Sequence, residues 1–146
     1  PKLNIVRALS CWGALIPTPD LKNILKDKSI HMRLAGLNLL RFKSHLLSAT
    51  NILELVEDLI DDFREEIVIE VIKILQRRDE ADVINCIAKI ARNGTDKTVS
   101  TALIALGAIG TQKSACLLSV LSQELTAETH RQTAQKQISH QYIYPL

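Results

Sequence analysis

Apolar residues recur along this chain at helical spacing, and the pattern repeats about every 31 residues. The first positions of four copies lie 27, 35 and 32 residues apart, at Ile5, Met32, Ile67 and Val99. Four residues further on stand Leu9, Gly36, Val71 and Leu103, and seven further on stand Trp12, Leu39, Ile74 and Leu106. A fainter copy begins at His130. We call these aligned positions the apolar ladder.

A helical motif with this period predicts stacked helical hairpins, because each hairpin buries its apolar stripe only against its neighbours. The sequence therefore predicts an all-α protein, a right-handed α-solenoid of about four and a half hairpins. Helix-breaking and helix-capping residues divide it into about nine helices, at residues 3–15, 20–26, 29–42, 48–60, 63–76, 81–92, 96–110, 113–125 and 127–139. Asn93-Gly94 is expected to end its helix in the left-handed conformation.

The two ends of the repeat domain, residues 1–139, differ in polarity. The helix at 127–139 is polar nearly all round, as a terminal repeat must be for solubility, and residues 140–146 are expected to form a tail. The helix at 3–15 is apolar over more than one stripe and has no hairpin partner before it. We therefore expect the chain to open half-way through a repeat. Either it is a portion of a longer solenoid, or residues 1–15 mediate self-association.

The ladder helices resemble the second helix of HEAT repeats, which carry an aliphatic residue, often an arginine, spaced alanines and a leucine-glycine pair. Residues 99–110 (VSTALIALGAIG) are similar to this pattern, and residues 32–40 (MRLAGLNLL) place Arg33 in the arginine position. Asp27 and Asp62 both lie five residues before the first ladder position, near the turn where the family favours aspartate. Glu70 and Lys73 depart from the pattern in the third copy. The resemblance covers essentially the whole chain and implies a superhelical scaffold that usually holds another macromolecule.

Composition limits the classes of partner. Of the 146 residues, 47% are apolar and only 3% are aromatic, and the net charge of +2 is too small to indicate a nucleic acid or a membrane. The longest uncharged stretch, 15 residues at 98–112, is shorter than the roughly 20 that span a bilayer. The three cysteines, at 11, 86 and 116, have no close pair, so we expect buried, reduced thiols and a cytoplasmic location.

Two neighbouring segments carry opposite charge. A basic segment at 20–45 contains only two acidic residues and the cations Lys22, Lys26, Lys28, Arg33, Arg41 and Lys43. An acidic segment at 54–70 contains a single basic residue, Arg64, and its candidate site residues are Glu54, Glu57, Asp58, Asp61, Asp62, Glu65 and Glu66. The acidic residues either recognise a basic partner segment or form the solvated side of a helix that buries Ile52, Val56 and Leu59. Some of these charges are expected to pair across neighbouring repeats.

The sequence gives little support for a catalytic site or a cofactor-binding site. Phe42 falls on the ladder face and is expected in the core, and the chain lacks the aromatic residues that HEAT-like DNA glycosylases use. It has no His-Glu pair of the kind that HEAT-like iron hydroxylases use, and its four histidines, His31, His45, His130 and His140, are expected at exposed or turn positions. We expect no catalytic residue, no metal and no cofactor.

The sequence therefore predicts a non-catalytic scaffold or adaptor that binds another protein. The alternative is a regulatory or sensor cytoplasmic domain of a larger membrane-anchored or multidomain protein. An enzyme of the glycosylase or hydroxylase type is a third and more distant hypothesis.

Overall fold

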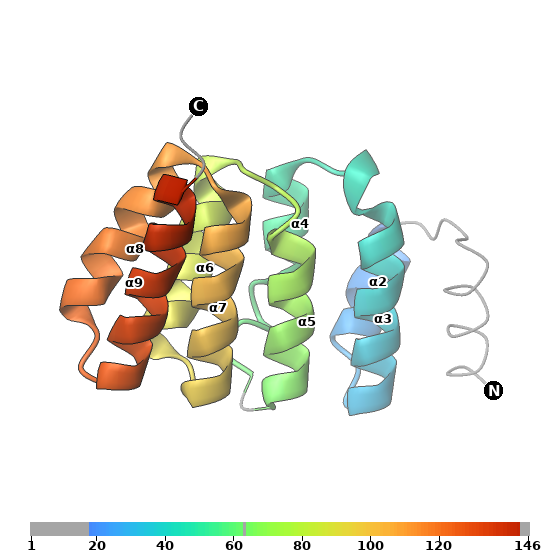
Figure 1. Cartoon of the computed structure of the whole chain (residues 1–146). Coiled ribbons are helices and arrows are strands. Elements are labelled where there is room, and N and C mark those ends of the chain that lie inside the picture. Colours follow the sequence, from blue (N-terminus) through green and yellow to red (C-terminus); the bar gives the residue numbers. More distant parts are fainter. Residues whose placement is uncertain (1–17, 63, 144–146) are drawn as a thin grey trace. The chain divides into compact units, whose positions relative to one another are not determined.

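The computed structural model describes residues 18–62 and 64–143, and all regular structure in these residues is helical (Figure 1). One short 3-10 helix, η1 (Ser44–Leu46), follows α3. The α-helices are α2 (Thr18–Leu25), α3 (Ile30–Lys43), α4 (Ala49–Val56), α5 (Glu65–Leu75), α6 (Ala81–Asn93), α7 (Asp96–Ile109), α8 (Gln112–Glu124) and α9 (Glu128–Ile143). The all-α prediction is confirmed for this part of the chain, and the helix predicted at 3–15 lies outside it.

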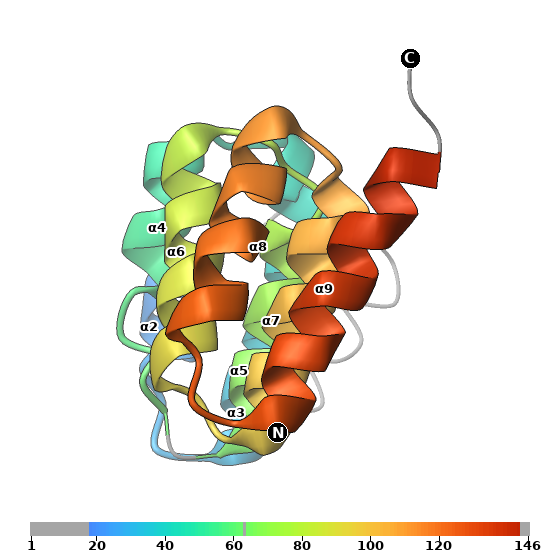
Figure 2. The same ribbon diagram turned by 60° about the vertical axis from the view of Figure 1, so that its left-hand side comes forward.

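The chain divides into two compact units between Ile74 and Leu75. The first unit holds α2, α3, η1, α4 and nearly all of α5, and α2 packs against α3 and α4. The second unit holds α6 to α9. Within it α6 and α8 lie side by side, as do α7 and α9 (Figure 2).

The apolar ladder is buried wherever the structure describes it. Its second, third and fourth copies lie on α3, α5 and α7, and Met32, Leu39, Ile67, Val71, Ile74, Val99, Leu103 and Leu106 are each no more than 5% exposed. The faint copy is also directed inward, because His130 and Ala134 on α9 are buried. The copy at Ile5 lies outside the described residues. The helical spacing thus identified the inward faces of all four described ladder helices.

Several helix ends differ from the prediction. Helix α4 ends at Val56 rather than near residue 60, and the chain continues in turns, in which the Leu59 N–H donates to the Val56 carbonyl (2.8 Å). Four carboxylates follow within six residues, and negative charge destabilises a helix C-terminus. Helix α9 continues to Ile143, into the predicted tail, since residues 140–143 contain no glycine or proline.

The predicted left-handed end at Gly94 is wrong. Gly94 is extended (φ −83°, ψ 177°), because only Gly94 and Thr95 connect α6 to α7. A Cβ at Gly94 would lie 2.8 Å from the Ile90 carbonyl oxygen, so this close approach needs glycine. The left-handed end is found after α7 instead, at Gly110 (φ 69°).

Gly36 marks a close contact between α2 and α3 in the first unit. A Cβ at this position would lie 2.7 Å from Cγ2 of Ile24 and 3.1 Å from Cδ2 of Leu25. Both neighbours are buried. The ladder position therefore holds glycine because α2 leaves no room for a methyl group.

We expect Gly36→Ala to lower the free energy of unfolding by about 1 kcal/mol. Overpacking costs about 1–3 kcal/mol, and the gain in helix propensity offsets up to about 1 kcal/mol of it. Urea denaturation measures the change, with His31→Ala as the control, because His31 is an exposed residue of the same helix. A stabilised Gly36→Ala variant would show that α2 does not approach α3 this closely.

No helix within residues 18–62 and 64–143 is long and apolar enough to cross a bilayer.

Candidate functional site

Arg33 and Asp62 bring the two oppositely charged segments into contact. Arg33 is on α3 and Asp62 lies in the turn before α5, 29 residues further on, and Nη1 of Arg33 donates to Oδ2 of Asp62 at 2.5 Å. The side chain of Asp62 is 6% exposed and that of Arg33 is 16% exposed. The expected pairing between neighbouring copies is thus found here. These two candidate residues therefore form an ion pair with each other within the first unit.

Asp62 has a second role that Asp27 repeats. Oδ1 of Asp62 accepts the N–H of Arg64 (2.8 Å), and Oδ1 of Asp27 accepts the N–H of Ser29 (2.9 Å). Each aspartate satisfies a backbone donor two residues ahead, at the same distance before the ladder position. This shared local structure explains why aspartate recurs in the two copies.

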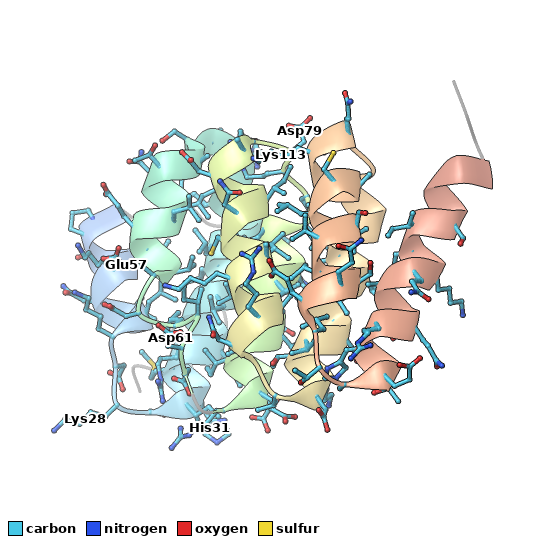
Figure 3. The ribbon with its side chains drawn as sticks, turned by 90° about the vertical axis from the view of Figure 1, so that its left-hand side faces the viewer. Lys28, His31, Glu57, Asp61, Asp79 and Lys113 are labelled. Carbon is cyan, nitrogen blue, oxygen red and sulfur yellow. The ribbon has the colours of Figure 1, made fainter. Side chains whose placement is uncertain are left out.

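The exposed part of the acidic segment is concentrated on α4 and the turn that follows it. Glu54, Glu57, Asp58 and Asp61 are exposed, and none of their side chains forms a hydrogen bond or an ion pair within the described residues. Figure 3 shows Glu57 and Asp61 on the side of the first unit that faces the viewer. On the opposite face of α4 Ile52, Leu55 and Val56 are buried. We call Glu54, Glu57, Asp58 and Asp61 the acidic surface.

Glu65 and Glu66 belong to a different element, the first turn of α5. Glu66 is exposed and Glu65 is half-buried. Carboxylates in the first turn of a helix are stabilised by the helix dipole. The helix dipole therefore accounts for the position of Glu65 and Glu66, whereas it does not account for the acidic surface.

The basic residues do not form one surface. Lys22, Lys26 and Lys28 are exposed on α2 and just after it, whereas Arg41 and Lys43 lie in the last turn of α3. Helix α3 is 14 residues long, about 21 Å, and Lys28 precedes its start, so the two groups are near opposite ends of the helix. In Figure 3 the side chain of Lys28 points away from Glu57 and Asp61.

Two predictions about single side chains are wrong. Phe42 was expected in the core and is 44% exposed. Helix α2 has 8 residues, about 12 Å, and is too short to cover the last turn of α3. Cys116 was expected to be buried and is exposed, because α8 directs Ser114, Leu118 and Leu121 inward instead. Cys86 is half-buried, and Cys11 lies outside the described residues.

The predictions for the histidines are correct only in part. His31 and His45 are exposed as expected, and the side chain of His140 lies outside the described part. His130 is buried, contrary to the prediction, because it occupies the first ladder position of α9. Its Nε2 lies 3.4 Å from Oδ1 of Asp96, at the start of α7. This contact joins α7 to α9 within the second unit.

The side chains that could hold a metal ion are dispersed. Among the residues that the structure describes, no group of three or more His, Cys, Asp or Glu side chains has a suitable arrangement.

Comparison with known proteins adds no family assignment. The sequence matches no protein-family model, and no curated protein matches it significantly. The repeat and the charged surface of this chain are therefore the features that bear on its function.

Proposed function

We propose that this chain is a non-catalytic module that binds another protein and is built as a right-handed α-solenoid of HEAT-like repeats. The ladder supports the repeat architecture, because equivalent positions of α3, α5, α7 and α9 are all directed inward. The equivalent hydrogen bonds of Asp27 and Asp62 support it further. Cys116 forms no disulfide bond among the described residues, which fits a reducing compartment, so we propose the cytoplasm.

The acidic surface is the observation that carries the proposed function. Its four carboxylates lie within eight residues, are exposed and have no cation paired with them among the described residues. Unpaired charges of one sign attract a partner of the opposite sign and orient it on approach. Catalysis favours groups in a site from which water is excluded, and these carboxylates are open to water. The proposed partner therefore presents a basic segment.

We expect the double variant Glu57→Lys, Asp61→Lys to lose this partner. With the chain as bait in an extract of its own cells, quantitative mass spectrometry should show recovery of the partner reduced about tenfold, which corresponds to about 1.4 kcal/mol. Recovery by the unchanged chain should also fall as salt is raised to 1 M, where the screening length is about 3 Å.

The matched control is Asp79→Lys, Asp82→Lys, which reverses two exposed carboxylates in the second unit. The control should recover the same partner as the unchanged chain. Equal recovery by the Glu57/Asp61 variant would contradict the proposed role of the acidic surface.

A further inference from the structure

The C-terminal end of α3 exposes two large apolar side chains in the first unit. Phe42 is 44% exposed and Leu46, in η1, is 56% exposed. They are four residues apart in a continuous helical stretch, a spacing that places side chains close together on a helix. Their exposure follows from the short α2, which cannot reach this end of α3.

Basic residues lie next to this apolar pair in the sequence. Arg41, Lys43 and His45 come from the same six-residue stretch, 41–46, and the chain has no acidic residue between Lys28 and Leu53. The guanidinium carbon of Arg41 lies 5.9 Å from the centroid of the Phe42 ring, and its Nη2 donates to Oδ1 of Asn38 (3.2 Å). Arg41 forms no ion pair with a described residue. We call Arg41, Phe42, Lys43, His45 and Leu46 the Arg41–Leu46 surface.

The helix dipole accounts for part of this surface only. Arg41 and Lys43 lie in the last turn of α3, where cations are favourable. That effect gives no reason for a phenylalanine and a leucine exposed beside them. A cation without an ion pair, Arg41, beside two exposed apolar side chains indicates a partner that offers both carboxylates and apolar groups.

We propose that the Arg41–Leu46 surface docks an acidic segment of a partner protein, one that carries apolar side chains among its carboxylates. The apolar side chains of the segment would cover Phe42 and Leu46, and its carboxylates would pair with Arg41. Burying an exposed Leu or Phe contributes about 1.5–3 kcal/mol, and the carboxylates supply orientation.

Other occupants fit less well. The acidic surface of a second copy offers carboxylates, but the apolar side of its α4 is buried. A single-stranded nucleic acid uses aromatic platforms for its bases, and here one phenylalanine stands beside a leucine. Stable membrane attachment requires a long apolar helix face or more than one anchor, whereas this surface offers two side chains.

The Arg41–Leu46 surface is independent of the proposed function, because it has the opposite charge and shares no residue with the acidic surface. The two tests can therefore fail separately.

The experiment measures fluorescence anisotropy of a labelled peptide of glutamate and leucine at helical spacing, titrated with the full chain. We expect saturable binding that Phe42→Ala, Leu46→Ala weakens about tenfold. Arg41→Glu should weaken it at least as much, and Arg41→Gln should do so to a smaller extent, without a change in the melting temperature. A peptide with serine in place of leucine should bind more weakly, and one with lysine in place of glutamate should not bind.

Two control variants match the apolar and the charged substitutions. Ile104→Ala removes a similarly exposed apolar side chain from the second unit, and Lys28→Glu reverses an exposed cation of the first unit. Both should leave the affinity unchanged. Three results would overturn the proposal: no saturable binding, equal binding by the Phe42/Leu46 variant, or tighter binding to phosphatidylserine vesicles or oligouridine than to the acidic peptide.

Discussion

Leu106→Ala should lower the free energy of unfolding by about 2–5 kcal/mol, because it removes most of a fully buried side chain and leaves a cavity. Leu106 is on α7 and is 0% exposed, and Ala102 and Leu103 on the same helix are equally buried. Helix α7 packs against α6, α8 and α9 in the second unit, so the space cannot close by the movement of one side chain. Urea denaturation followed by circular dichroism measures the effect.

Ile104→Ala provides the matched control on the same helix. Ile104 is 51% exposed, so its truncation should change the free energy of unfolding by less than about 0.5 kcal/mol. The two variants remove similar aliphatic groups two residues apart, and only burial distinguishes them. Equal effects would contradict the ladder register and with it the repeat that underlies the proposed architecture.

The ladder could be predicted because a helical stripe is a local property of the sequence. Residues such as Met32, Ile67 and Val99 lie three or four residues from their partners on the same face, and burying one face requires no knowledge of distant contacts. The inward position of His130 follows from the same register. Residue type indicated an exposed histidine there, and the register was the better guide.

The predictions are wrong where a neighbouring helix determines the burial or the backbone conformation of a residue. Phe42 has a ladder-face position, but the length of α2 leaves it uncovered. Gly94 has the sequence of a left-handed helix end, but the short connection to α7 requires an extended residue. The local pattern of apolar and polar residues gives neither the length of the helix that packs against a residue nor the direction of the helix that follows it.

The candidate site shows the same limit. The sequence identified two segments of opposite charge, but it could not select Arg33 and Asp62 as the pair among six cations and seven acids. Local backbone geometry partly explains why Asp62 is the acid that pairs. Its carboxylate accepts a hydrogen bond from the N–H of Arg64, which holds it in place. The remaining exposed charges become candidates for binding only after that pair is assigned.

Asp62→Asn should destabilise the first unit by about 3 kcal/mol, because it leaves the charge of Arg33 largely buried and without its partner. Nε of Arg33 is already a buried donor without a hydrogen-bond partner within the described residues. Arg33→Met should also destabilise, because the carboxylate of Asp62 is 6% exposed and would retain the backbone N–H of Arg64 but not the cation. Unfolding in urea is measured for both single variants and for the double variant.

The double variant should be more stable than the sum of the single effects predicts, with a coupling energy of about 1–3 kcal/mol, because it removes both charges together. Glu70 and Lys73 give the comparison, since this pair on α5 is 3.2 Å apart but its side chains are 32% and 50% exposed. Its coupling should be about 0.5 kcal/mol or less and should fall with added salt, whereas the Arg33–Asp62 coupling should change little. Additive effects of Arg33→Met and Asp62→Asn would show that the two side chains do not interact. Arg33 and Asp62 would then be available for binding together with the other charges of the basic and acidic segments.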